Sequence, residues 1–428
     1  MRDLALILVI TYCALRALPH PWIGIMGWTW LSMMNPHKQT WQLDDMPVAM
    51  AMAIATFIGV VVTRDKRSLP VTRETVVLFL FMVWMCITLP FSFDAAASTD
   101  MWSKVMKIDL MVLVALLVLH TRQHIVLLVC VLAGSLGFYG FKGGLFTIVN
   151  GGNYRVWGPD GTFIAGNNEL ALALVMAIPL MRFLQLIATS TRVKHALSVV
   201  MALTAAAAFG SHSRGAMVAI AAMALVLWWR SQRKGMMGIV LLALGAGLIM
   251  FMPESWTTRM ETIGTYEEDG SATGRINAWW MAWNLARDRF FGGGFEIYNP
   301  AMFGQYAPEP TDVHAAHSIY FQVLGQHGFV GLVLFMLMWL FVWMSCSTLR
   351  LQGAQRPETQ WLSHLGAMCQ VSLIGYAVGG AFLSLAYFDL PYNILILAVL
   401  GRRWMDSKAW LGEAVAPPAA LQARQQSA

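Results

Sequence analysis

Long apolar stretches recur along this chain as far as residue 402, and they constrain its fold more than any other feature. Each is roughly 15–25 residues long, the length that an α-helix needs to cross a bilayer. Of the 428 residues, 57% are hydrophobic and only 12% are charged. A soluble protein of this size needs more charge to cover its surface. We therefore predict an all-α, polytopic integral membrane protein.

The order of apolar and basic segments predicts a topology. The expected spans are approximately 4–18, 22–34, 47–63, 75–92, 105–119, 124–139, 168–187, 195–210, 215–229, 236–252, 318–345, 362–384 and 390–402. Because Lys and Arg concentrate in cytoplasmic loops, the cytoplasmic side is marked by "RDKR" at 64–67, Arg122, "TRVK" at 191–194, "RSQRK" at 230–234, Arg350 with Arg356, and Arg402 with Arg403. Alternate threading satisfies all of these clusters and gives about 12 transmembrane helices, with one early segment broken or re-entrant.

This topology divides the chain into four parts. An N-terminal transmembrane bundle of about ten spans covers 1–252, and a large exterior loop covers 253–317. C-terminal transmembrane helices follow over 318–403, and we expect the Ala/Pro/Gln-rich tail, 404–428, to be cytoplasmic and disordered. Inside the exterior loop, "GRINAWWMAWNLARDRFF" repeats Trp and Ala at helical spacing. That pattern predicts a helix that lies on the membrane or roofs a cavity.

Seven cations fall in the predicted exterior connections 140–167, 211–214 and 253–317, where Lys and Arg are normally rare: Lys142, Arg155, Arg214, Arg259, Arg275, Arg287 and Arg289. Arg214 stands in a very short turn beside Gly215, where a backbone is easily approached. A charge held at the bilayer surface is costly without an anionic partner. Bidentate binding of phosphate explains this arginine, and so does extension of its side chain to lipid headgroups. The full set favours a phosphate site.

Three histidines gather near the start of the next apolar run, in "DVHAAHSIYFQVLGQHGFVGL" at 312–332. They have three possible roles, as metal ligands, as a catalytic base, or as polar residues at a membrane interface. A metal is the weakest of these, because His314 and His317 need a third ligand and Asp312 is the only carboxylate nearby. His317 is the best candidate base, since it directly precedes a span whose rigid helix would orient it. His327, inside the run, is expected to be a buried, hydrogen-bonded core residue.

The motifs of several reaction classes are absent from the sequence. We find no HExxH, no GxSxG, no P-loop and no exterior DxD-type pair, and the run 267–269 is expected to be a solvated acidic loop. Exterior cations with an imidazole suit transfer of a group from a phosphate leaving group: the arginines neutralise the phosphate and a neutral histidine takes a proton from the incoming hydroxyl. Outside the cytoplasmic membrane there is no sugar nucleotide, so the donor would be lipid-linked, such as a polyprenyl diphosphate sugar.

Four segments follow one another on the predicted outer face: "YRVWGPDGTFIAGNNELALAL" at 154–174, "SHSRGA" at 211–216, "SATGRINAWWMAWNLARDRFFGGGFEIY" at 271–298, and "HAAHSIYFQVLGQHGFVGL" at 314–332. Together they resemble the O-antigen ligase family, within the superfamily shared with O-antigen polymerases and protein O-oligosaccharyltransferases. The resemblance spans roughly residues 140–345. Ser318 departs from it, because many relatives have Asn there, and we assign Ser318 no role.

The resemblance implies a GT-C-type glycosyltransferase of the bacterial inner membrane with its active site in the periplasm. It implies transfer of a glycan from undecaprenyl diphosphate to a hydroxyl of lipid A–core, with inversion and without a metal or other cofactor. By the same resemblance, His317, Arg214 and Arg275 are the catalytic residues; the two arginines bind the diphosphate and His317 acts as base or orients the donor. We add four residues as substrate-binding candidates: Lys142, Arg155, Arg259 and His314.

Two other functions remain open from the sequence. A protein O-oligosaccharyltransferase or an O-antigen polymerase would use the same donor and differ in its acceptor. A transporter of anionic glycolipids would also use arginines in a cavity, but it should show an internal repeat and basic residues near the midplane of its spans. The chain has no such repeat and its exterior cations cluster at one surface, so transport is the less favoured function.

Overall fold

The computed structural model describes residues 2–44, 46–63, 68–231, 233–261 and 270–413, and the elements formed by these residues are helices. The first half contains α1 (Arg2–Ala17), α2 (Pro21–Met34), η1 (Pro36–Gln39), α3 (Val48–Val62), α4 (Arg73–Thr88), η2 (Leu89–Phe91), α5 (Ala95–Val118), α6 (Arg122–Val149), α7 (Asn167–Ile187), α8 (Thr191–Gly210) and α9 (Arg214–Arg230). The second half contains α10 (Lys234–Phe251), α11 (Glu254–Glu261), α12 (Gly270–Asp288), α13 (Pro300–Tyr306), α14 (Ile319–Gly353), η4 (Pro357–Thr359), α15 (Gln360–Gly379), η5 (Gly380–Phe382), α16 (Asp389–Asp406) and α17 (Trp410–Glu413).

Every expected span coincides with a helix, so the prediction of an all-α membrane protein is confirmed at this level. Within the described residues, seven helical segments are long and apolar enough to cross a bilayer: Arg73–Phe91, Arg122–Val149, Asn167–Ile187, Thr191–Gly210, Lys234–Phe251, Ile319–Gly353 and Pro357–Phe382. The remaining expected spans form shorter or more polar helices, such as α3. The chain is a multi-pass membrane protein; the figure of 12 crossings stays a prediction.

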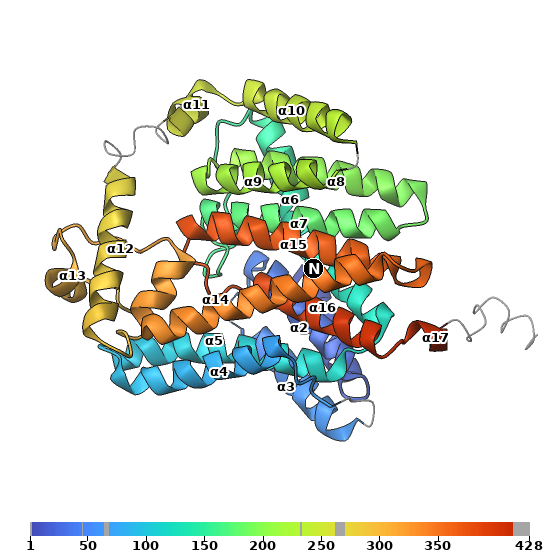
Figure 1. The fold of residues 1–428 in the computed structure, drawn as a ribbon, viewed down its shortest axis with the longest axis horizontal. Coiled ribbons are helices and arrows are strands. Elements are labelled where there is room, and N and C mark those ends of the chain that lie inside the picture. Colours follow the sequence, from blue (N-terminus) through green and yellow to red (C-terminus); the bar gives the residue numbers. More distant parts are fainter. Residues whose placement is uncertain (1, 45, 64–67, 232, 262–269, 414–428) are drawn as a thin grey trace, which may run out of the picture.

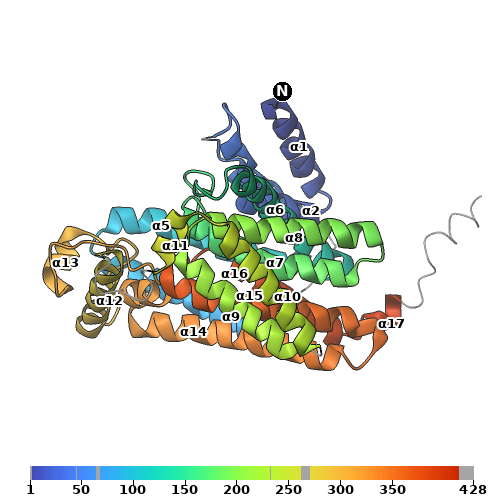
Figure 2. The same cartoon turned by 90° about the horizontal axis from the view of Figure 1, so that it is seen from above.

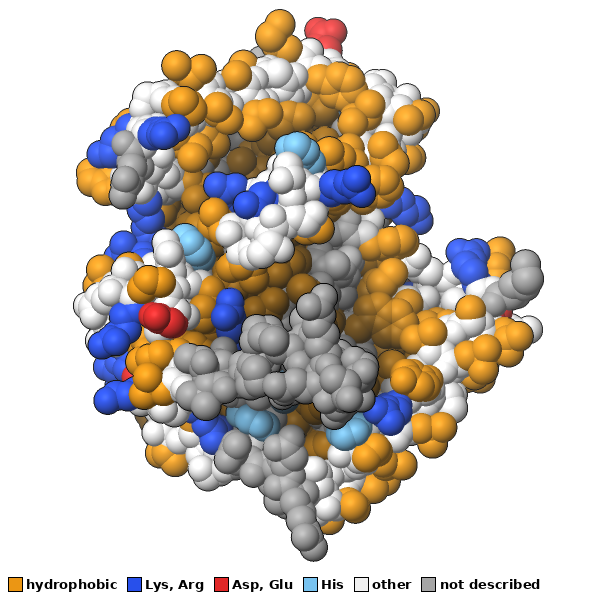
Figure 3. All heavy atoms as spheres, turned by 90° about the vertical axis from the view of Figure 1, so that its right-hand side faces the viewer, with side chains coloured by type: hydrophobic (Ala, Val, Ile, Leu, Met, Phe, Trp, Pro, Cys, Tyr) orange, Lys and Arg blue, Asp and Glu red, His pale blue; other side chains and the backbone are white. Residues whose placement is uncertain are grey.

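Helix α12 lies across one end of the bundle, where it packs against the start of α14, and α13 lies outside it (Figure 1). The view from above shows α1 projecting from one side of the molecule and α14 running along the other side (Figure 2). Seen from the end opposite α12, the surface carries many basic and few acidic side chains (Figure 3). Three arginines of the predicted cytoplasmic clusters lie at helix termini at this end: Arg122 at the start of α6, Arg230 at the end of α9 and Arg350 in the last turn of α14. The positive-inside rule would place this end in the cytoplasm.

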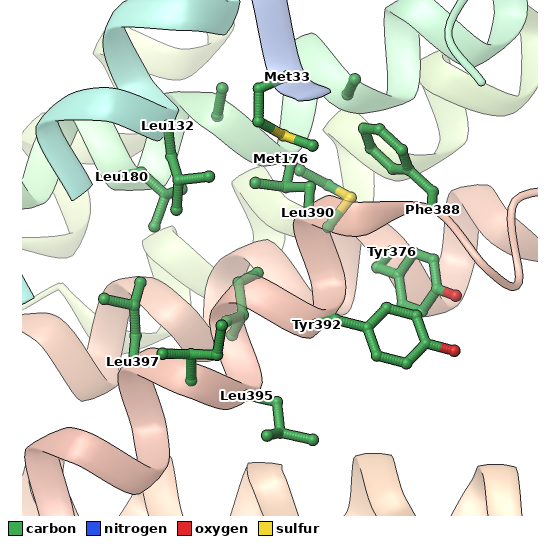
Figure 4. Packing of buried hydrophobic residues seen from close by; sticks show 14 of the residues in the cluster. Met33, Leu132, Met176, Leu180, Tyr376, Phe388, Leu390, Tyr392, Leu395 and Leu397 are labelled. Carbon is green, nitrogen blue, oxygen red and sulfur yellow. The ribbon is translucent and has the colours of Figure 1, made fainter. Parts of the chain in front are cut away.

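The core of the bundle is a single large apolar cluster. Figure 4 shows part of it, with Leu390, Leu395 and Leu397 of α16 surrounded by side chains from other helices. Tyr376 and Tyr392 are buried there, and their hydroxyls donate to the backbone carbonyls of the segment before α16. Because buried polar groups are costly unless they are hydrogen-bonded, these bonds fix the segment that joins α15 to α16.

Helix α6 is longer than its apolar run predicts, and this corrects the expected position of Lys142. The connection was expected to begin at residue 140, but the helix continues to Val149, so Lys142 lies on α6. The reason is close helix packing: a Cβ on Gly140 would lie 2.1 Å from the Thr204 hydroxyl oxygen, and one on Gly144 would lie 2.2 Å from the Leu203 carbonyl oxygen, both in α8. Glycines that resemble a loop signal in the sequence allow two helix backbones to approach.

Helix α14 is not the continuous rod that the expected span 318–345 implied. Gly328 has φ 68° and ψ −172°, and the helix kinks there. The Gly-rich tail of the α12 segment compensates for the break, since Gly293 N–H donates to the Gly325 carbonyl and Gly294 N–H to the Gln326 carbonyl, both at 3.0 Å. A break in a membrane helix is tolerated when other protein groups satisfy the freed backbone.

Candidate active site

His317 lies on a turn immediately before α14, not on the helix itself. Its φ is +41°, a left-handed conformation that is uncommon for a residue with a large side chain. Ser318 is the N-cap residue, and α14 begins at Ile319. His317 thus directly precedes the span, as predicted, but it lies outside the helix, so the turn needs support from elsewhere.

Helix α12 supplies that support. The indole Nε1 of Trp279 donates to the carbonyl oxygen of Ala316 at 2.7 Å, next to His317. The same indole stacks on Phe321, with ring centroids 5.1 Å apart and planes 6° from parallel. One side chain thus fixes the backbone before His317 and the first turn of α14 after it. The predicted helix in the exterior loop is confirmed, and its position explains the aromatic residues.

Other residues of α12 hold the segment that precedes the turn. The Asn277 amide nitrogen donates to the carbonyls of Glu309 and Asp312 at 2.8 and 3.0 Å, and its oxygen accepts from Glu309 N–H at 2.9 Å. A Cβ on Gly274 would lie 2.2 Å from Cδ2 of His314, so the imidazole lies directly against the helix backbone. His314 also forms an ion pair with Asp312, Nε2 to Oδ1 at 2.8 Å.

The environment of His317 keeps its imidazole neutral. Burial, together with the charges of Arg275 and His314, lowers the pKa of His317 from its ordinary 6.5 to about 4. Its Nδ1 is buried and has no hydrogen-bond partner among the described residues. A neutral histidine can accept a proton, whereas a protonated one cannot. The structure thus brings three of the predicted residues, His317, Arg275 and His314, into one electrostatic neighbourhood.

Glu169 is a member of this neighbourhood to which the sequence analysis gave no role. It stands in the first turn of α7, and its carboxylate interacts electrostatically with Arg275 of α12. The side chain folds back over the start of its own helix, because a Cβ on Gly166 would lie 2.0 Å from its Oε2. The signal was present in "GNNE" at 166–169, but nothing in the sequence showed that the far-separated Arg275 would face it.

Arg214 is the first residue of α9, in the turn that Ser213 caps by accepting from Ala216 N–H. This turn is tied to α7, since the Asn167 amide donates to the Ser211 carbonyl at 2.7 Å.

The turn also approaches the start of α14 through η5. A Cβ on Gly215 would lie 3.1 Å from Cβ of Phe382, and one on Gly380 would lie 2.7 Å from Cδ1 of Ile319. Arg214 therefore belongs to the same end of the bundle as His317.

The remaining candidates fall in other places. Lys142 and Arg155 line a separate pocket of about 360 Å³ together with Lys38, which the sequence analysis did not select. Arg259 lies on α11, but its side chain is outside the described residues, as are the predicted acidic loop 267–269 and the tail from 414.

His327 is buried as predicted; its Nδ1 hydrogen-bonds the Thr88 hydroxyl at 2.8 Å.

A metal site needs several His, Cys, Asp or Glu side chains around one point. Within the described part of the chain, no three such side chains converge on one point. His314 and Asp312 bond to each other, and the sulfhydryls of all five cysteines are free. The reaction without a metal stays a prediction.

The chain was also compared with known proteins. Residues 199–336 match a family model described as O-antigen ligase, and residues 1–189 match a family of unknown function (DUF5935). No curated protein matches the chain. The first match contains the turn of Arg214, helix α12 with Arg275, and the turn of His317, while Glu169 and the pocket of Lys142 lie in the second. Residues 199–336 thus form a domain of the O-antigen ligase family.

Proposed function

We propose that this protein transfers a glycan from undecaprenyl diphosphate to a hydroxyl of lipid A–core, at the periplasmic face of the bacterial inner membrane. The observation that carries the proposal is the neutral imidazole of His317 beside the guanidinium of Arg275. A base and an anion-binding cation at one place are what glycosyl transfer from a diphosphate requires. The O-antigen ligase domain at residues 199–336 supports the same class of reaction.

The transfer is a single displacement. The acceptor hydroxyl oxygen forms a bond to the anomeric carbon while the bond from that carbon to the diphosphate oxygen breaks, and the electron pair stays on the diphosphate. His317 takes the hydroxyl proton. Arg275 and Arg214 stabilise the charge that develops on the leaving diphosphate. Attack opposite the leaving group inverts the anomeric configuration, and no step requires a metal or another cofactor.

Each part of the chain has a role in this proposal. The N-terminal bundle, 1–252, holds Glu169 and Arg214, and the periplasmic loop, 253–317, supplies Arg275 and the turn of His317. The C-terminal helices, 318–403, anchor that turn. Glu169 orients Arg275 through the electrostatic interaction between the two side chains. His314 acts as a helper that its ion pair with Asp312 holds against α12.

The test is complementation of a ligase-deficient host, read as the ladder of its lipopolysaccharide on a gel. The unmutated chain should restore the ladder, while His317→Ala, Arg214→Ala and Arg275→Ala should not. Arg287→Ala is the matched control, because Arg287 is exposed on the same helix as Arg275. A normal ladder from His317→Ala would remove the catalytic assignment.

Failure of the unmutated chain, with good expression and a compatible donor, would point to a protein O-oligosaccharyltransferase or a polymerase with a different acceptor. Full activity of purified protein in excess chelator is the expected result for a metal-independent reaction. Loss of activity that Mg²⁺ or Mn²⁺ restores would contradict it.

A further inference from the structure

A second cationic site lies apart from the turn of His317. Its pocket, of about 360 Å³, opens between η1, α6 and the loop 155–160, and its cations are Lys38, Lys142 and Arg155. These residues come from η1, from α6 and from the loop that follows α6. None of the residues that line the pocket belongs to α12 or to the turn before α14.

The pocket carries an excess of positive charge. Lys142 and Arg155 are exposed, and neither forms an ion pair with another described residue. Lys38 is paired with Asp44 at 2.9 Å, and Asp160 is the acidic residue in the lining. Two unneutralised cations that face one pocket repel each other, and an anion placed between them removes that cost.

The other side chains of the pocket suit a sugar. The indole of Trp157 is 59% exposed at the pocket, where its face can pack against the C–H face of a sugar ring. Deeper in the pocket, Gln39 Nε2 donates to the Tyr139 hydroxyl at 2.8 Å, and that hydroxyl donates to the Met34 carbonyl. These bonds fix polar groups with which sugar hydroxyls can exchange hydrogen bonds.

We propose that this pocket binds the anionic saccharide of the acceptor, with a phosphate or carboxylate on Lys142 and Arg155 and a sugar ring on Trp157. The inference rests on the proposed function, in which Arg214 and Arg275 hold the diphosphate of the donor. A second set of cations at the same end then needs a second anion, and the acceptor is the other substrate.

The loop of the pocket is joined to the proposed donor site. Val156 N–H donates to the Gly210 carbonyl at 3.0 Å, directly before the turn that carries Arg214. On its other side the pocket reaches Leu170, the neighbour of Glu169 in the first turn of α7. The loop of the pocket is therefore held against the segment that carries Arg214 by a direct backbone hydrogen bond.

The test is direct binding to the purified full chain without donor, so that no transfer takes place. The probe is a soluble phosphorylated oligosaccharide, prepared by removing the lipid from a lipopolysaccharide core, and its dephosphorylated form is the comparison. Lys142→Ala and Arg155→Ala should each weaken binding of the phosphorylated probe roughly tenfold, as expected for loss of a charged hydrogen bond. Trp157→Ala should weaken both probes, and Arg287→Ala should change neither.

Equal affinity for the two probes, or unchanged affinity in Lys142→Ala and Arg155→Ala, would overturn the proposal. Displacement of the saccharide by phosphatidylglycerol nanodiscs, with no displacement by phosphatidylcholine nanodiscs, would also overturn it, because the pocket would then hold a lipid headgroup. A chain that binds the probe as expected but transfers no glycan would leave this inference standing and remove the proposed function.

Discussion

The indole Nε1 of Trp279 donates a hydrogen bond to the Ala316 carbonyl at 2.7 Å, and this bond joins the helix of Arg275 to the turn of His317. Trp279 and Arg275 are one helical turn apart on α12. The position of the proposed base relative to the proposed phosphate-binding cation is therefore set by one rigid helix and one side chain. Groups supported by such rigid elements keep the geometry that catalysis requires.

Removing this hydrogen bond should slow transfer more than it weakens donor binding. Trp279→Phe keeps an aromatic ring against Phe321 but loses the Nε1 donor, so the Ala316 carbonyl loses its partner at a cost of about 1 kcal/mol. We expect kcat to fall by about tenfold or more, because a small displacement of the base is costly, while KM for the donor changes less. Equal changes in kcat and KM would contradict a positioning role.

A methyl group on Gly274 should disturb the site through His314. The added Cβ would lie 2.2 Å from Cδ2 of that imidazole, so Gly274→Ala must displace the imidazole. Gly304→Ala is the control, because no heavy atom lies within 4 Å of the added Cβ. We expect Gly274→Ala to reduce the transfer rate, while Gly304→Ala leaves it unchanged. Similar rates for both variants would show that the packing of His314 against α12 does not affect transfer.

The lowered pKa of His317 predicts a plateau in the pH dependence of transfer. An ordinary histidine becomes protonated near pH 6.5, but His317 stays neutral until the pH approaches its pKa of about 4. The free-enzyme profile, kcat/KM, should therefore not fall between pH 7.5 and pH 5.5 through titration of this base. The bound diphosphate raises the pKa, so kcat should begin to fall at a higher pH than kcat/KM. A kcat/KM midpoint near 6.5 that His317→Gln removes would contradict the burial argument.

The buried imidazole of His317 also makes the stability of the fold depend on pH. In the pH window from about 6.5 down to about 4, the unfolded chain binds a proton at His317 and the folded chain does not. Stability rises with pH wherever the unfolded state binds more protons, so this residue destabilises the fold as the pH falls through the window. His317→Gln should make thermal unfolding less dependent on pH there; an unchanged dependence would contradict the buried neutral state.

The kink of α14 predicts a stability contrast between two glycines. Gly328→Ala forces a side chain into a left-handed conformation and places its Cβ 2.3 Å from the Phe290 carbonyl oxygen, which should cost about 2 kcal/mol or more. Gly245→Ala, in α10, meets no neighbour within 4 Å and should be neutral or slightly stabilising. Thermal unfolding in detergent measures both. A Tm for Gly328→Ala equal to that of the unmutated chain would show that the break is not fixed as described.

The sequence was informative about helices and less so about where they meet. Apolar periodicity located every expected span, because burial in lipid and in a helical core imposes the same pattern on each segment. It placed Lys142 in a loop, since glycines that pack helix against helix look like loop residues. The sequence placed His317 directly before a helix. Nothing in "HAAHS" reveals the positive φ of His317 or the hydrogen bond that the distant Trp279 indole donates to the Ala316 carbonyl.

Two contributors to the sites were missed for a related reason. Glu169 and Lys38 gain significance only when the fold brings them to Arg275 and to Lys142 respectively. Of the exterior cations selected by topology, Arg214 and Arg275 lie at the end of the bundle that holds His317, and Lys142 and Arg155 lie at a separate pocket. Charge at one face of the membrane was visible in the sequence, but its division into two places required the packing of α6, α7 and α12.

The central claim is that His317 accepts the proton of the incoming hydroxyl. It is tested most directly with purified protein, by measuring the rate of glycan transfer in unmutated chain and His317→Ala, and donor affinity in each. Loss of a general base should lower kcat by about 10²–10⁴-fold while the dissociation constant of the donor changes only a few-fold. A His317→Ala protein that transfers glycan at nearly the unmutated rate, with the donor bound equally well, would contradict the account.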